Sequence, residues 1–372
     1  MLRLITGVVL AGSLLIGCSG DHTESKSKEA GVITASGSTF AYPVVSKWAE
    51  KYYTNTQVQI NYQATGSGAG IRQIQERIVD FAATDTPLTT NDLAKNQLVQ
   101  FPLVLGGIAI VANLDGIKSG AVALDGTTLA RIFSSDITTW NDPAIVKLNP
   151  TVNLPTLPIT IVHRSDGSGT TYNFTDYLSK VSPDWQKNIG LGTMVHWKAG
   201  VGAKGNAGIA AYVARVPGAI GYVEYAYAKQ EGLSWLALYN RDGKIVAPHQ
   251  DSFAAAAANA KWQQTPDFDL LLTDQPGANS WPITATVFIL LPKVIDDEKK
   301  ANLMLAFFDW LYREGQPIAT QLDYVPLPAN VYALVADHWA KTLQNAAGKL
   351  LWAPNQAATA NSSSSSTPSS HP

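Results

Sequence analysis

The chain has 372 residues, a formal net charge of -2 and only 15% charged residues, a balance that argues against a nucleic-acid-binding protein. Apolar residues make up 46%, enough for a large core, and the length has room for two domains of typical size. The single cysteine, Cys18, excludes a disulfide framework within the chain and a cysteine-based zinc site.

Both ends of the chain have the composition of segments outside a folded core. Residues 1–17 carry a short basic start and then an apolar stretch, the form of a secretory signal peptide. The stretch ends in Leu15-Ile16-Gly17-Cys18, which resembles a bacterial lipobox, so we predict cleavage before Cys18 and a lipid on that cysteine; the alternative is a plain signal peptide. Residues 18–30 would form the lipidated cysteine with a flexible tether, and residues 354–372 a disordered Ser-rich tail.

One local pattern occurs three times between these ends: a short strand, a loop of Gly, Ser and Thr, and a helix. The loops are Ser36–Phe40, Thr65–Gly70 and Arg164–Thr170. The strands before them are expected at 32–35, at 58–62 and at 159–162. Apolar residues at helical spacing predict the helices after them: Val44, Val45, Trp48 and Tyr52; then Ile71, Ile74 and Ile78; then Phe174, Tyr177 and Leu178.

Such a loop at the start of a helix can hold an anion. The first N–H groups of a helix have no internal partner, and the helix dipole makes that end partly positive. Glycine lets the backbone close around a ligand, and Ser or Thr hydroxyls add donors. A single loop of this kind also serves as an ordinary cap or turn. Three in one chain indicate a small, highly charged oxyanion held from several sides.

Two charged residues make the prediction of an oxyanion site more specific. Arg164 ends the third strand, and its guanidinium suits a tetrahedral oxyanion, although an ion pair with Asp166 is equally compatible with its position. Asp85 follows the short apolar strand 81–84, a position that also suits a helix N-cap. Because an ionised carboxylate only accepts hydrogen bonds, Asp85 would favour an anion that carries its own proton, such as hydrogen phosphate, over sulfate.

Eight segments together resemble one family, the phosphate-binding protein of the bacterial phosphate ABC transporter. They are Gly37–Phe40, Tyr62–Gly68, Val79–Asp85, Arg164–Thr170, Gly205–Ala211, Pro217–Ala228, Trp281–Thr284 and Phe307–Trp310. The resemblance implies these phosphate ligands, with Phe40 acting through its backbone N–H: Thr39, Phe40, Ser67, Asp85, Arg164, Ser168, Gly169 and Thr170. It also implies that Asp166 holds Arg164, and Ser38 is a departure because alanine is common there.

The resemblance further implies a type II periplasmic-binding-protein fold, in which two α/β lobes are joined by two crossover segments with a ligand cleft between them. We place one lobe at residues 31–112 plus 284–353 and the other at 113–283. The implied protein is a monomer in the periplasm or, through a lipid on Cys18, on the outer face of the cell membrane, and its partners are phosphate and the membrane permease. No cofactor or metal is expected.

Two other features suggest a different function, but each is weaker evidence than the three anion-binding loops. Gly200–Gly205 matches G-x-G-x-x-G with Glu224 about twenty residues on, but it lies in mid-chain and follows no long apolar strand, so a structural turn is the better interpretation. His163 is interpreted as a strand residue rather than a catalytic base. No nucleophile elbow or P-loop occurs, so we expect a binding protein and not an enzyme. A sensor, adhesin or secretion-linked protein on the same fold stays open, as does, less favoured, a phosphatase.

Overall fold

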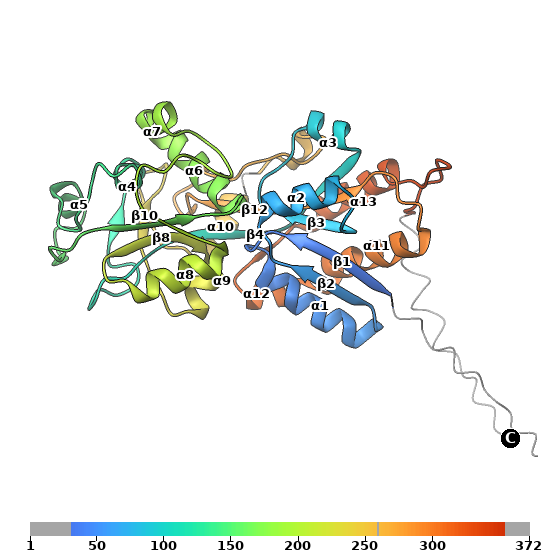
Figure 1. Ribbon diagram of the computed structural model, residues 1–372, viewed down its shortest axis with the longest axis horizontal. Coiled ribbons are helices and arrows are strands. Elements are labelled where there is room, and N and C mark those ends of the chain that lie inside the picture. The colour runs from blue at the N-terminus through green and yellow to red at the C-terminus, as the bar shows by residue number, and fades with distance from the viewer. Residues whose placement is uncertain (1–30, 259, 354–372) are drawn as a thin grey trace, which may run out of the picture.

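One sheet runs the length of the protein, with its strands in the order β2-β1-β3-β12-β4-β8-β6-β7 (Figure 1). The computed structural model describes residues 31–258 and 260–353. The strands of this sheet are β1 (Val32–Gly37), β2 (Gln59–Gln63), β3 (Phe81–Thr84), β4 (Leu98–Ala112), β6 (Thr160–Arg164), β7 (Val201–Ala203), β8 (Ala219–Glu224) and β12 (Thr284–Pro292). Two short strands, β9 (Ser234–Trp235) and β13 (Val325–Pro326), also pair with β4. A small second sheet contains β5 (Ala123–Leu124), β10 (Ala237–Tyr239) and β11 (Ile245–Val246).

Strand β4 is shared by two groups of parallel strands. Its residues 98–107 pair antiparallel with β12, and its residues 108–112 pair antiparallel with β8. On one side of it β1, β2 and β3 run parallel, and on the other β6, β7 and β8 do. All of its residues are buried, which agrees with its uninterrupted apolar sequence, since a strand covered on both faces needs no polar side.

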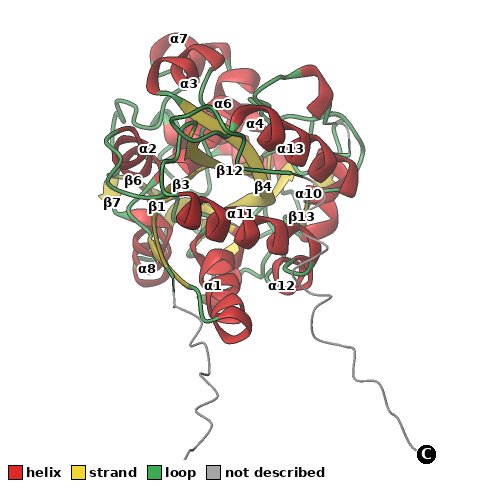
Figure 2. Cartoon of the chain, turned by 90° about the vertical axis from the view of Figure 1, so that its right-hand side faces the viewer, coloured by secondary structure: helices red, strands yellow, loops and turns green. Residues whose placement is uncertain are grey.

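Helices cover both faces of the sheet. They are α1 (Tyr42–Thr56), α2 (Ser67–Gln75), α3 (Thr90–Asn96), α4 (Gly126–Phe133), α5 (Pro143–Leu148), α6 (Gly169–Val181), α7 (Pro183–Asn188), α8 (Gly205–Arg215), α9 (Tyr225–Gln230), α10 (Gln250–Ala257), α11 (Glu298–Arg313), α12 (Gln316–Gln321) and α13 (Ala329–Thr342), with a 3₁₀ turn at Trp262–Gln264. Figure 2 shows α2 and α3 on one side of the first strand group and α1, α11 and α12 on the other.

Alternate residues of β3 explain this arrangement. Phe81 packs its ring against Phe307 and Phe308 of α11, with ring centroids 6.5 and 5.1 Å away. The next residue, Ala82, points to the opposite face and packs with Ile74 of α2 and other apolar side chains. Successive side chains of a strand point to opposite faces, so the two faces of the sheet hold separate apolar clusters.

The second strand group is covered in the same way. Tyr222 of β8 stacks on Phe174 of α6 with ring centroids 4.3 Å apart. On the other face Gly221 leaves no space for a side chain, because a Cβ there would lie 2.7 Å from a methyl carbon of Ile209 in α8. The α/β class predicted from the sequence is confirmed, with helices on both sides of a mixed sheet in which two groups of parallel strands flank the antiparallel strands β12 and β4.

The three predicted strand–loop–helix units are present, with one error at a helix end. The apolar face predicted for α1 is buried, as are Phe174, Tyr177 and Leu178 of α6. Ile78, however, was predicted on the second helix and lies beyond it with 60% of its surface exposed. Helix α2 ends at Gln75 because the chain turns at Arg77, where φ is 60° and the guanidinium donates to the carbonyl oxygens of Ile74 and Asn96.

Several predictions fall outside the described residues: the signal peptide, the lipid on Cys18 with its tether, and the Ser-rich tail. Within residues 31–258 and 260–353, none of the helices combines the length and the apolar character needed to cross a membrane.

Candidate anion-binding site

Strands β1, β3 and β6 deliver the predicted site residues from their carboxyl ends. Gly37 ends β1 just before Ser38, Thr84 ends β3 just before Asp85, and Arg164 is the last residue of β6. In open α/β sheets this edge is where ligands bind, because the loops there are followed by helix N-termini. Helices α2 and α6 begin at Ser67 and Gly169, so the amino ends of both point to this place.

The Asp85 side chain is the meeting point of these loops and is 1% exposed. Its Oδ1 accepts a short hydrogen bond from the Ser38 hydroxyl, and its Oδ2 accepts one of 3.4 Å from Thr170. Its backbone N–H donates to Ser67 Oγ at 3.4 Å, and its carbonyl oxygen accepts from Asn173 Nδ2 at 2.7 Å. Asp85 therefore contacts loops that are far apart in the sequence, and the helix cap that its position also suggested is supplied to α3 by Thr89 instead.

Burial dominates the ionisation of Asp85. Loss of water around the carboxyl raises its pKa to about 7, although the hydrogen bond from Ser38, the charge of Arg164 and the hydrogen bond from Thr170 all act to lower it. The side chain is therefore close to the balance between an acceptor-only carboxylate and a neutral acid that can donate.

Arg164 is held by Asp166, as the sequence allowed. The guanidinium Nε donates to Asp166 Oδ1 at 2.7 Å and NH2 donates to Oδ2, so the pair is bidentate. NH1 remains directed at Thr170 Oγ1, 3.4 Å away. Burial alone would raise the pKa of Asp166, but the hydrogen bonds and charge of Arg164, with a bond from the Gly205 N–H, outweigh it and keep that pKa below its usual value. Asp166 thus orients Arg164 and offsets its charge.

Main-chain N–H groups supply the positive character that the side chains do not. The N–H groups of Phe40, Ser67, Gly169 and Thr170 have no acceptor among the described residues. All four residues are buried, and a buried donor without an acceptor costs on the order of 1–3 kcal/mol. Donors gathered from three loops form a site that an anion would satisfy.

The structure brings most of the predicted ligands into one contact network. Asp85 contacts Ser67 and Thr170 through hydrogen bonds, and Arg164 contacts Thr170. Gly169 lies directly against this group, because a Cβ there would lie 2.7 Å from both Asp85 and Ser67 Oγ.

The other predicted ligands lie beside this network. Thr39 joins it through Asn206, whose Nδ2 reaches Thr39 Oγ1 at 2.8 Å and Thr170 Oγ1 at 3.5 Å. Phe40 is fully buried and its ring packs edge-on against Tyr324, with ring centroids 6.1 Å apart, so the ligand role predicted for it depends on its backbone N–H. Ser168 caps α6, its Oγ accepting from the Thr171 N–H at 3.0 Å, and its own N–H donates to the carbonyl of Thr193. The role of these residues as ligands stays a prediction.

Four side chains around the site were not selected from the sequence. Three are tyrosines that each donate to the carbonyl of a successive loop residue: Tyr62 to Ser38 at 2.7 Å, Tyr227 to Thr39 at 2.8 Å and Tyr324 to Phe40 at 2.6 Å. The fourth is Asn206. Tyr62, Tyr227 and Asn206 lie in segments that carried the family resemblance and Tyr324 does not, but no local pattern indicates a role for any of them at the site.

The G-x-G-x-x-G segment has a structural role, as interpreted from the sequence. Its last glycine, Gly205, begins α8 with a φ of 69° and donates its N–H to Asp166 Oδ1 at 3.0 Å. His163 stacks on Trp197 with ring centroids 4.9 Å apart, and its Nδ1 lies 3.1 Å from the carbonyl oxygen of Arg164. Burial lowers the pKa of His163, which agrees with a neutral strand residue.

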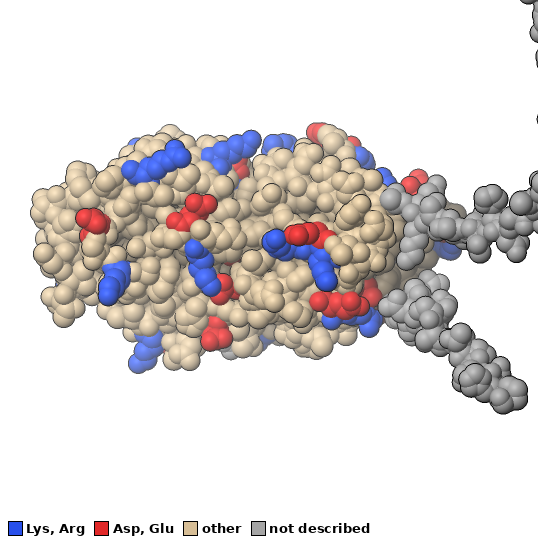
Figure 3. All heavy atoms as spheres, turned by 90° about the horizontal axis from the view of Figure 1, so that it is seen from below, with Lys and Arg blue, Asp and Glu red and all other residues tan. Residues whose placement is uncertain are grey.

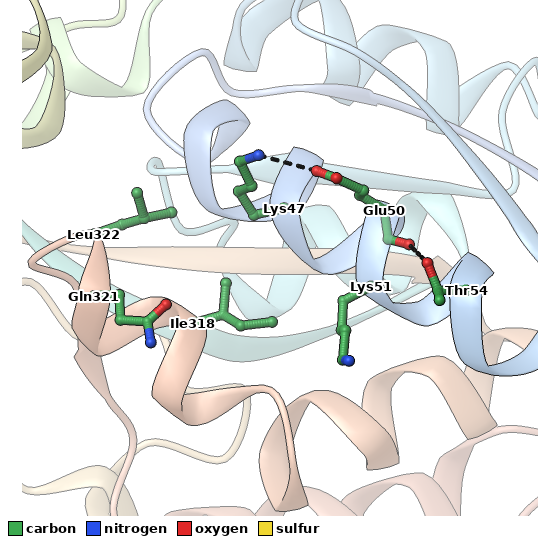
Figure 4. Close-up of a pocket in the computed structure, with 7 residues that line it drawn as sticks. All are labelled: Lys47, Glu50, Lys51, Thr54, Ile318, Gln321 and Leu322. Atoms are coloured by element: carbon green, nitrogen blue, oxygen red, sulfur yellow. Dashed lines mark hydrogen bonds and ion pairs between the residues drawn. The ribbon is translucent and has the colours of Figure 1, made fainter.

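A separate surface cavity of about 340 Å³ lies between α1 and α12 (Figure 4). Its lining residues are Lys47, Glu50, Lys51, Thr54, Ile318, Gln321 and Leu322. Lys47 and Glu50 form an ion pair of 3.0 Å there, but both side chains are more than half exposed. Because water competes freely for these groups, this cavity is a weaker candidate than the buried donors around Asp85.

Comparison with known proteins shows the family to which the chain belongs. Residues 22–314 match the PBP superfamily domain. The phosphate-binding protein PstS of Haemophilus influenzae is 49% identical over 316 residues, which are 85% of this chain and 95% of that protein. The chain belongs to the PstS family of phosphate-binding proteins. The family resemblance predicted from the sequence is therefore confirmed.

Solved structures with low sequence identity to this PstS-family chain share its fold. A high-affinity periplasmic phosphate-binding protein with bound phosphate matches with a TM-score of 0.69 at 21% identity, over 86% of this chain and 96% of the other. An ABC-type phosphate transport receptor from Vibrio cholerae matches with a TM-score of 0.52 at 21% identity, over 80% of this chain and all of the other. The PBP-like α/β fold predicted for the chain is thus confirmed.

Proposed function

We propose that this protein binds inorganic phosphate outside the cytoplasm and delivers it to the permease of a phosphate ABC transporter, without chemistry on the ligand. Membership of the PstS family supports this function. The observation that carries it is the group of buried main-chain N–H donors that have no acceptor in the described part of the chain, among them those of Ser67, Gly169 and Thr170 beside Asp85. Such donors match an anion without needing a net basic surface, and basic and acidic side chains are interspersed over the face in Figure 3.

The proposed ligands are those implied by the resemblance, with Asp85 accepting the proton of hydrogen phosphate and Asp166 fixing Arg164. The proposal is supported by a chain of hydrogen bonds, in which Asp85 contacts Ser67 and Thr170, and Thr170 contacts Arg164. A carboxylate in an anion site repels sulfate, which is unprotonated at neutral pH, while hydrogen phosphate offers it a proton.

Two lobes, residues 31–112 plus 284–353 and residues 113–283, are proposed to close around the anion. Support comes from the backbone bond of 2.9 Å between the Gly68 N–H and the Gly167 carbonyl oxygen, which joins loops from the two segments beside the site. A ligand that contacts both segments favours the closed form by its differential affinity. We also propose that the protein acts as a monomer, tethered to the membrane by a lipid on Cys18.

Titration calorimetry of the purified protein with phosphate, arsenate and sulfate tests the function. Phosphate is expected to bind, arsenate to compete because it also carries a proton, and sulfate to bind far more weakly. Equal affinity for sulfate and phosphate would remove the role given to Asp85, and failure to bind phosphate would remove the function. Turnover of a chromogenic phosphate ester would favour the phosphatase alternative.

A further inference from the structure

Asn206 is the second residue of α8 and is fully buried beside the site. Its side-chain Nδ2 donates to Thr39 Oγ1 at 2.8 Å, and its backbone N–H donates to the same oxygen at 3.2 Å. Its Oδ1 accepts from the backbone N–H of Glu224 at 2.9 Å. One side chain therefore joins the loop after β1 to the end of β8.

The contact with Glu224 fixes which way the Asn206 amide points. A main-chain N–H can only donate, so the amide oxygen must face Glu224 and the amide nitrogen must face Thr39. The reversed amide would place two donors against each other at Glu224 and lose the bond there. Asn206 is thus a hydrogen-bond donor to Thr39 and not an acceptor from it.

The direction of the Thr39 hydroxyl proton follows. A hydroxyl oxygen accepts two hydrogen bonds and donates one. Both bonds accepted by Thr39 Oγ1 come from Asn206, and none of the described residues accepts the Thr39 proton. Tyr227 binds the Thr39 carbonyl oxygen instead, which leaves the hydroxyl unaffected. The O–H group is therefore left to donate to a ligand.

We propose that Asn206 is a positioning residue that sets the Thr39 hydroxyl as a donor to the bound anion. The inference rests on the proposed function, in which Thr39 is a phosphate ligand. Thr39 belongs to the segment before residue 113 and Asn206 to the segment after it, so the donor is oriented only when the two segments are in contact. Closure and anion binding are coupled through this pair.

Replacement of the amide by an isosteric carboxyl group tests the idea. In Asn206→Asp one oxygen still accepts from Glu224, but the other accepts the Thr39 proton and turns it away from the anion. A hydrogen bond to a charged group contributes roughly 1.5–3 kcal/mol, so the phosphate Kd should rise about 10- to 150-fold, with any direct charge repulsion adding to that.

A double-mutant cycle separates the Thr39 effect from added charge or loss of packing. Asn206→Asp is introduced into Thr39→Ser, which keeps the hydroxyl, and into Thr39→Val, which lacks it. Calorimetry gives the phosphate Kd of each protein. The loss caused by Asn206→Asp should be at least tenfold larger in the Ser background than in the Val background. Equal losses in the two backgrounds would overturn the inference.

Two controls keep the outcome interpretable. Asn206→Ala in the same two backgrounds replaces the aspartate variant if that variant does not fold, and it should show a smaller loss that again disappears with Thr39→Val. Wild-type protein that does not bind phosphate would contradict the proposed function, whereas wild-type binding with equal losses in both backgrounds contradicts only the role of Asn206. Thermal unfolding without ligand verifies that each variant is folded.

Discussion

Asp85→Asn tests the origin of anion selectivity. The carboxyl group is buried and its pKa is about 7, so at pH 8 it is mostly an acceptor-only carboxylate. A second negative charge about 4 Å away costs on the order of 4 kcal/mol at an effective dielectric constant of about 20, or roughly a thousandfold in affinity. Hydrogen phosphate offsets this cost by donating its proton, and sulfate does not.

The variant removes the charge and places an amide where it can donate to sulfate. At pH 8 we expect the ratio of sulfate Kd to phosphate Kd to fall by about 100- to 1,000-fold, mainly through tighter sulfate binding. Calorimetry with each anion, and phosphate displacement by sulfate, measure the ratio. An unchanged ratio in Asp85→Asn would refute the reasoning.

The pH dependence of sulfate binding gives the same test without a mutation. With a pKa of about 7, the protonated fraction of Asp85 rises about tenfold between pH 8 and pH 6, so sulfate affinity should rise by about the same factor. Asp85→Asn should show no such rise. Ser38→Ala is a matched control: the Ser38 hydrogen bond lowers the Asp85 pKa, so its loss should move the onset of sulfate binding to higher pH.

Three further predictions concern the surroundings of the site. Asp166→Asn leaves the buried Arg164 without its carboxylate partner, so the free energy of unfolding of the ligand-free protein should fall by roughly 3 kcal/mol. Saturating phosphate should restore part of that loss. An equal loss with and without phosphate would contradict this prediction. Gly167→Val adds a side chain whose Cβ would lie 3.2 Å from Gly68 Cα, so the phosphate Kd should rise about tenfold or more. The free energy of unfolding without ligand, measured with denaturant, should stay within about 1 kcal/mol of the wild-type value. Unchanged affinity would show that this contact does not control binding. Burial raises the pKa of Glu224 to about 8, so the folded state holds a proton that the unfolded state releases above about pH 4.5. The free energy of unfolding should therefore fall as pH rises from 5 to 8. Glu224→Gln should flatten this slope in denaturant titrations, and identical slopes would argue against the raised pKa.

Local sequence determined the parts from which the site is built. The three Gly, Ser and Thr loops could be found because each strand–loop–helix unit is contiguous in the chain and has a recognisable period on either side. Arg164 and Asp166 could be paired because they are two residues apart. The end of α2 was missed because the turn at Arg77 depends on carbonyl oxygens of residues 96 and 97, which no local pattern reveals.

Only the tertiary structure decided how these parts act together. Ser38 and Asp85 are 47 residues apart and Thr39 and Asn206 are 167 apart, so neither contact has a sequence signature. The raised pKa of Asp85 likewise comes from its burial between residues that precede position 113 and residues that follow it. Local patterns specify helices, strands and loop chemistry because those depend on near neighbours; the direction of a hydroxyl proton and the charge of a buried carboxyl depend on groups that meet only when the chain is folded.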